Sequence, residues 1–170
     1  MPRVAVEPER GRRAPARADA PEVRVLRQFR QVFNAVKTHF QQLERRAGLG
    51  GAPMWALSVV AGAPGIGVGG LAAAMDIHPS TASNLVRTLA ERGFVQAERD
   101  QLDRRAVRLT LRPAATRLLR RTPGPFEGVL PEALAALDAR TLKRLEADLG
   151  RLIAVLDVDE SAARIPLADL

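Results

Sequence analysis

Residues 78–111 read HPSTASNLVRTLAERGFVQAERDQLDRRAVRLTL and decide the fold. Polar residues in the first half recur at i, i+3, i+4 and i+7, and apolar residues recur opposite them, so a helix here has one packing face and one outward face. The polar face holds Ser80, Ser83, Asn84 and Arg87, and the apolar face holds Ala82, Val86 and Leu89. Gly93 ends the helix.

A charged ribbon follows this helix. Residues of strand character run from Phe94 up to Asp103-Arg104-Arg105 and back to Leu111, which predicts two strands with guanidinium groups at the tip. Asp100 and Asp103 flank the arginines, and a carboxylate can orient a guanidinium for insertion into a minor groove. An arginine pair can also be plain solvated charge, but a polar helix followed by a charged ribbon favours nucleic-acid binding.

The candidate DNA-binding residues come from both elements. They are Ser80, Thr81, Ser83, Asn84 and Arg87 on the helix and Arg104 and Arg105 on the ribbon, with Asp100 and Asp103 as supports. Asn can read adenine and Arg can read guanine in the major groove. One residue near Pro79 is expected to cap the helix, which alone would not require Asn84 and Arg87 on the same face.

The formal charge of +7 is unevenly distributed. Residues 79–121 hold ten Lys and Arg against four Asp and Glu, a net +6, whereas residues 122–170 hold five against nine, a net −4. A generally basic surface would not produce this asymmetry. The charge therefore indicates that an anionic partner, double-stranded DNA, meets the central segment.

The composition excludes several functions. There is no cysteine, which removes disulfides and thiolate chemistry, and the two histidines, His39 and His78, have no carboxylate pair beside them. We therefore expect no catalytic residue, cofactor or metal site, and no enzyme. No apolar run approaches the roughly 20 residues that span a bilayer, and no secretory pattern begins the chain. We expect a soluble intracellular protein without a membrane partner.

The flanking regions predict the remaining organisation. Residues 1–20 are rich in Pro, Arg and Ala and predict a disordered arm, whose arginines could touch DNA or be solvated. Residues 21–47 and 126–158 predict helices for dimerisation, and residues 159–170 a C-terminal tail. The helical seams are Leu26, Phe29, Phe33, Val36, Phe40 and Leu43 in the first region and Leu142, Leu145, Leu149, Leu152 and Leu156 in the second. The seams could pack on each other within one chain, but two long seams outside a central domain favour a homodimer.

Residues 52–121 predict the DNA-binding domain. Short helices over 54–61 and 67–75 and a turn at 76–79 precede the polar-faced helix, which is a helix-turn-helix order. After the ribbon, helix resumes over 112–121 until Thr122-Pro123-Gly124-Pro125 breaks it, and Asp138 caps the last long helix. The predicted fold is mainly α with a small two- to three-stranded β-wing.

Two further features have a structural and a functional interpretation. Gly65 to Gly70 matches G-x-G-x-x-G, but too few residues follow it to close a strand-helix-strand nucleotide site, so we interpret the glycines as a loop. Trp55 and His39 lie on helices expected to meet beneath the DNA-binding half. They are core residues in one interpretation and line a ligand pocket in the other.

These residues resemble the MarR family of bacterial winged-helix transcription regulators, over about residues 23–157. The resemblance rests on Pro79 to Ser83, Leu89 to Val95, and Asp100-x-x-Asp103-Arg104-Arg105-Ala106 through Leu109-Thr110-Leu111. It implies a cytoplasmic, nucleoid-associated homodimer with winged helix-turn-helix domains and terminal dimerisation helices. It also implies recognition helices in adjacent major grooves, wing arginines in minor grooves, and a small, often aromatic and anionic, effector.

The chain departs from the family's pattern at several positions. Asn84 stands where the family frequently has Arg, Pro113 and Ala114 follow the wing where Thr-x-x-Gly is usual, and Ala56 follows Trp55 where urate-responsive members have an acid. The lack of cysteine and the scarcity of histidine argue against peroxide-sensing and zinc-sensing members.

The sequence thus predicts a dimeric repressor that binds a pseudo-palindromic operator and that a small molecule releases. A winged-helix protein-interaction module that does not read DNA is the alternative, and a small hydrolase or nucleotide-binding enzyme comes third.

Overall fold

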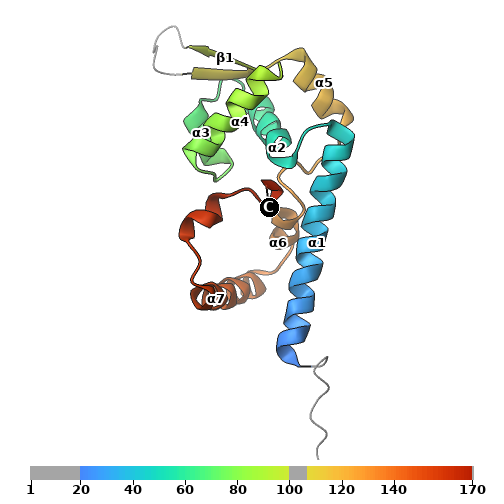
Figure 1. The fold of residues 1–170 in the computed structure, drawn as a ribbon, viewed down its shortest axis with the longest axis vertical. Helices are drawn as coiled ribbons and strands as arrows, with labels where there is room; N and C mark the ends of the chain where they lie inside the picture. Colours follow the sequence, from blue (N-terminus) through green and yellow to red (C-terminus); the bar gives the residue numbers. More distant parts are fainter. Residues whose placement is uncertain (1–19, 100–106, 170) are drawn as a thin grey trace, which may run out of the picture. The chain divides into compact units, whose positions relative to one another are not determined.

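The computed structural model describes residues 20–99 and 107–169 (Figure 1). The chain divides into two compact units, residues 1–34 and residues 35–170. Helix α1 (Pro21–Ala47) contributes its first turns to one unit and its last turns to the other. The disordered arm predicted over residues 1–20 lies, except for Ala20, outside the described residues.

The described part of the first unit is helical. The rings of Phe29 and Phe33 stack with their centroids 6.4 Å apart. Four large apolar side chains of this segment are between 43% and 58% exposed: Val25, Leu26, Val32 and Phe33. The seam predicted for this helix is therefore solvent-exposed in its first half.

The second unit follows the predicted element order. It contains α2 (Gly51–Gly62), α3 (Val68–Ala74), α4 (Pro79–Glu91), β1 (Val95–Arg99), β2 (Val107–Leu111), α5 (Pro113–Arg121), α6 (Leu130–Ala135), α7 (Ala139–Leu156), and the 3-10 helices η2 (Glu160–Arg164) and η3 (Leu167–Asp169). Most of these bounds lie within one to three residues of the sequence prediction. Helix α6 lies in the region 126–158, where helices were predicted without individual bounds for this one, and the two 3-10 helices were not predicted.

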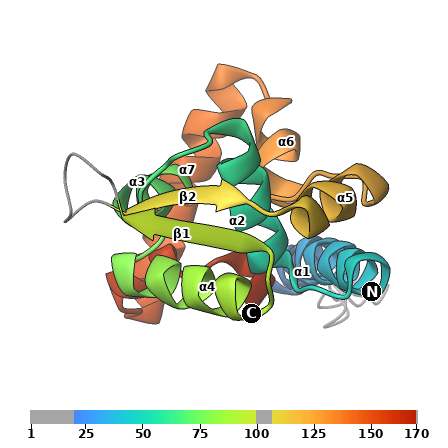
Figure 2. The same cartoon turned by 90° about the horizontal axis from the view of Figure 1, so that it is seen from above.

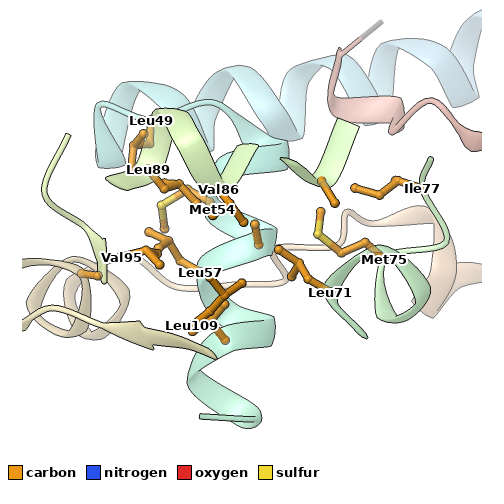
Figure 3. Close-up of a cluster of buried hydrophobic side chains, with 14 of the residues drawn as sticks. Leu49, Met54, Leu57, Leu71, Met75, Ile77, Val86, Leu89, Val95 and Leu109 are labelled. Atoms are coloured by element: carbon orange, nitrogen blue, oxygen red, sulfur yellow. The ribbon is translucent and has the colours of Figure 1, made fainter. Parts of the chain in front are cut away.

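Helix α2 is the centre of the core. It is apolar around its whole circumference, so it can be buried on every side, and Met54, Ala56 and Leu57 have no exposed surface. Leu71 of α3, Leu89 of α4 and Leu109 of β2 are also buried in this cluster (Figure 3). Truncating any one of these leucines to Ala is expected to cost about 2 to 5 kcal/mol of unfolding free energy.

The two strands pair antiparallel, with Val95 opposite Leu111 and Ala97 opposite Leu109. Strand β1 lies beside α4, and β2 lies beside α2 (Figure 2). The loop before α3 is hydrogen-bonded to β2: Gly65 N–H donates to the Leu109 carbonyl at 2.8 Å, and Leu109 N–H donates to the Ile66 carbonyl at 3.0 Å. The β-wing, predicted with two to three strands, is confirmed with two.

These hydrogen bonds also explain the glycine motif. Residues 63–67 form the loop between α2 and α3, and α3 has only seven residues. A Cβ at Gly70 would come within 2.9 Å of Ile66 Cγ1, so this glycine permits close packing of the loop on the helix. The glycines therefore belong to a loop of the winged helix, as predicted from the sequence.

The C-terminal part of the unit includes a helix with little cover. Asp138 caps α7, since its Oδ1 accepts from Thr141 N–H at 3.0 Å, and α7 has no buried residue. After α7 the chain returns to the core: Pro166 is buried, and Ala168 packs against the core cluster. The segment interpreted as a tail from its sequence therefore packs against the domain.

Candidate nucleic-acid interface

The N-terminus of α4 is fixed by His78 and Pro79. Pro79 is the first helical residue, where its fixed φ suits the helix and its missing N–H costs nothing. His78 Nδ1 accepts a hydrogen bond from the Ser80 backbone N–H at 3.3 Å and lies 2.7 Å from Ser80 Oγ. The sequence predicted a cap next to Pro79 without naming the residue, and the structure shows that it is His78. Proline at the first helical position was the available signal, because it places the cap one residue earlier.

The turn before this cap fixes the orientation of α4 relative to α3. Asp76 adopts a left-handed conformation with φ 49°, which Asp tolerates better than most residues, and the next N–H, of Ile77, donates to the Ala72 carbonyl at 3.0 Å. Ile77 is then buried. This turn sets the direction in which α4 leaves the core.

The polar and apolar residues of α4 separate as the spacing predicted. Ala82, Val86 and Leu89 are buried, whereas Ser80, Ser83, Asn84 and Arg87 are exposed and Thr81 is half-buried. The helix ends at Gly93, whose φ of 72° suits glycine, and Phe94 N–H donates back to the Leu89 carbonyl at 2.9 Å. The structure brings the five predicted helix residues together at the solvent-facing side of α4.

Hydrogen bonds within this face orient its side chains. Ser83 Oγ donates to the Pro79 carbonyl at 2.9 Å, and Arg87 Nη2 donates to Asn84 Oδ1 at 3.2 Å. Arg87 and Asn84 are therefore the two long polar groups of the face, and they are held side by side. Arg92, at the helix end, instead binds the Gly48 carbonyl at 3.0 Å and lies over the Phe94 ring.

The wing tip falls outside the described residues. This holds for all four predicted wing positions, Asp100, Asp103, Arg104 and Arg105. The described strands β1 and β2 lead toward and away from that tip, and Arg108 on β2 is exposed.

Trp55 and His39 do not line the same cavity in the described part of the chain. Trp55 is half-buried and borders a cavity of about 280 Å³. His39 borders a smaller cavity of about 80 Å³ with Arg46 and Pro125, and its Nε2 lies 2.8 Å from the Pro125 carbonyl oxygen. Only Trp55 is therefore positioned to meet a ligand in the larger cavity.

Residues 20–99 and 107–169 also bear on metal binding and on membrane spanning. These residues contain no group of three or more His, Asp or Glu that could hold a metal ion. No helix within the same ranges is long and apolar enough to cross a membrane.

Comparisons with known proteins agree with this geometry. The MarR-family model matches residues 47–106. A Staphylococcus aureus MepR–DNA complex superposes with a TM-score of 0.53 at 16% identity, covering 84% of this chain and 100% of that one. A MepR-like protein complexed with pseudoligands superposes with a TM-score of 0.52 at 14% identity, covering 78% of this chain and 94% of that one. YusO from Bacillus subtilis superposes with a TM-score of 0.50 at 14% identity, covering 78% of this chain and 94% of that one.

No curated protein sequence matches the chain significantly. The solved structures share its fold at low sequence identity, so the fold is what they establish. The family match includes α4 and β1 and ends directly before β2, the strand that pairs with β1. Residues 47–106 therefore match the MarR family, and the described part of this stretch, together with β2, has the winged helix-turn-helix fold.

Proposed function

We propose that this chain is a dimeric, sequence-specific DNA-binding transcription regulator, which acts as a repressor and is released from a pseudo-palindromic operator by a small molecule. The observation that carries the proposal is the exposed polar face of α4, with Arg87 and Asn84 held side by side opposite a buried apolar face. A helix of this kind can enter a major groove while its other face stays packed.

Charge supports the same assignment. Residues 79–121, which contain α4, both strands and α5, carry a net +6, and residues 122–170 carry a net −4. Neutralisation of phosphates by Lys and Arg supplies most of the non-specific affinity for DNA. The structure of S. aureus MepR, a protein of this fold, was solved in complex with DNA. The regulator proposed here would accordingly reside on the bacterial nucleoid.

Two apolar surfaces, one in each unit, support a homodimer. The first unit exposes Phe33 and its apolar neighbours, and α7 in the second unit exposes Leu142, Leu152 and Leu156. Contiguous exposed apolar side chains usually mark an interface. A second copy of the chain fits this role, because paired recognition helices read two half-sites about one helical turn apart.

Release by a small molecule requires that the ligand bind one arrangement of the two recognition helices better than the other. The cavity beside Trp55 lies within the second unit and includes the turn that precedes α4. A ligand there would act on the spacing of the recognition helices through that turn.

The test is binding of the purified protein to a duplex from the promoter of its own gene, measured by fluorescence anisotropy over a salt series. We expect specific binding that Arg87→Ala weakens about tenfold or more. Arg151→Ala is the matched control: Arg151 is an exposed α7 residue whose side chain contacts Asp148, and its loss should leave affinity unchanged.

The wing is tested in the same assay. Arg105→Ala should reduce the slope of log K against log salt by about 1, as the loss of one phosphate contact would. Unchanged affinity and slope in both Arg87→Ala and Arg105→Ala would contradict DNA reading by these elements, and would favour the protein-interaction module instead.

A further inference from the structure

The cavity beside Trp55 has the size and wall of a small-molecule site. Its volume is about 280 Å³, close to the lower limit of ligand pockets, so it suits a molecule with one ring. Side chains from α1, α2 and α6, from the α3–α4 turn and from the C-terminal segment line it, and most of them are apolar. Phe40 and Trp55 add aromatic surface.

The charges on this wall all have the same sign. Asp76 and Glu127 are the charged residues among the described lining, which contains no Lys, Arg or His. Within the described ranges, neither carboxylate forms a hydrogen bond or an ion pair with another side chain. An anion in the cavity would face these two carboxylates, whereas a cation could pair with them and lie against the indole of Trp55.

We propose that this cavity binds a small aromatic or aliphatic amine in its cationic form. The proposal rests on the proposed function for its regulatory meaning and replaces the anionic effector that the family resemblance implied. The physical reason for the replacement is the wall itself, which offers no described cationic group to neutralise a carboxylate ligand.

Asp76 connects this site to the recognition helix. It is the left-handed residue of the α3–α4 turn, and it stands directly before buried Ile77 and the capping His78. Met75 and Ile77 line the cavity as well. An ammonium group paired with Asp76 would therefore contact the turn that directs α4, two residues before its cap. Such a contact would bias the position of α4.

The C-terminal segment completes the wall. Ala163, Ile165 and Leu167 border the cavity, and buried Pro166 lies between them. Ala168 follows Leu167 and lies close to Gly51: a Cβ added at Gly51 would fall 2.7 Å from the methyl carbon of Ala168. Because the segment packs on α2 in this way, the cavity is enclosed on that side by the protein's own chain.

The experiment compares three probes of matched size on the full-length protein at neutral pH: phenethylamine, phenylacetate and 2-phenylethanol. Binding is followed by Trp55 fluorescence and by calorimetry. We expect the amine to bind about tenfold more tightly than the acid, with the alcohol between them. Equal binding of amine and acid, preference for the acid, or no binding of any probe would overturn the proposal.

Two substitutions locate the charge preference. Asp76→Asn keeps a residue that tolerates the left-handed conformation, and Glu127→Gln keeps the side-chain shape, so both should fold. Each should reduce the preference for amine over acid, and the double variant should abolish it. Glu132→Gln, an exposed α6 carboxylate that does not line the cavity, should leave it unchanged. A preference that survives intact in the double variant would refute the assignment.

The regulatory meaning is measured separately. Phenethylamine should weaken operator binding by the wild type and should have less effect on Asp76→Asn. If the protein binds DNA but prefers the acid, the ligand assignment fails while the proposed function stands. If it binds the amine but no DNA, the proposed function fails while the site remains.

Discussion

Arg87 Nη2 donates a hydrogen bond to Asn84 Oδ1 at 3.2 Å, across one turn of the exposed face of α4. Both side chains could read a base edge, and the contact holds them in a common orientation before DNA arrives. Restricting a long arginine side chain in advance lowers the entropy lost when it binds. The pair should therefore behave as one reading unit.

The first prediction is that the two residues are energetically coupled in DNA binding. Asn84→Ala should weaken operator affinity in the wild-type background, by a direct contact or by releasing Arg87, and should cost less when Arg87 is already alanine. A double-mutant cycle of operator affinities measures this difference, expected to be about 0.5 kcal/mol or more. Strict additivity would show that the hydrogen bond does not matter for recognition.

The second prediction concerns the cap of α4. His78→Ala removes the acceptor of the Ser80 N–H and should lower the unfolding free energy by about 0.5 to 2 kcal/mol, whereas His78→Asn should retain most of the stability. Urea denaturation of the three proteins provides the measurement. Equal loss in both variants would mean that packing, not capping, is the role of His78.

The third prediction is a pH dependence located at α7. The side-chain hydrogen bond from Thr141, followed by the Thr141 backbone N–H, holds the pKa of Asp138 below its ordinary value. A carboxyl whose pKa is lowered on folding stabilises the fold above its unfolded pKa, near 4, and this contribution disappears as the pH falls through the folded pKa.

Asp138→Asn should therefore differ from the wild type in Tm at pH 6 and converge with it toward pH 2. The control is Asp157→Asn, which replaces a carboxylate at the other end of the same helix. A Tm difference for Asp138→Asn that is constant across this range would contradict the ionic part of the cap.

The fourth prediction uses two helical glycines. A Cβ at Gly51 would overlap the Phe40 ring and the Ala168 methyl group, whereas a Cβ at Gly69 would meet nothing within 4 Å. Gly51→Ala should therefore destabilise the protein by about 1 to 3 kcal/mol and loosen the C-terminal segment. Gly69→Ala should leave it unchanged or slightly more stable. Thermal denaturation and limited proteolysis near residue 165 measure both effects.

The fifth prediction addresses the dimer. Leu152→Glu puts a charge on the exposed apolar seam of α7, and Ala147→Glu puts the same charge on the opposite side of that helix. Light scattering should show a dimer for the wild type and for Ala147→Glu, and mostly monomer for Leu152→Glu. A dimer in all three would move the interface away from this seam.

The recognition helix and the wing strands could be predicted from the sequence because their signals are local. The spacing of Ala82, Val86 and Leu89 defines the buried face of α4, and a glycine at 93 ends it, whatever the rest of the chain does. Asp138 is a cap for the same reason, since the hydrogen bond to Thr141 spans three residues. A cap next to Pro79 was predicted in the same way, but His78 was not named because histidine is an uncommon cap.

Residues brought together from distant parts of the chain carried no such signal. His39 and Pro125 meet across 86 positions, and Gly51 meets Ala168 across more than one hundred. No periodicity encodes these contacts. The sequence placed His39 and Trp55 in one pocket because their two helices were expected to meet, but in the described residues each side chain borders a different cavity.

The sequence by itself determined the winged helix, the concentration of positive charge on residues 79–121 and the polar face of α4, because helix and strand periods and capping act over a few residues. Only the tertiary structure decided which side chains enclose the cavity and that its described charges are carboxylates. That decision depends on burial against distant segments, and the free energy of such contacts exists only once the chain has closed on itself.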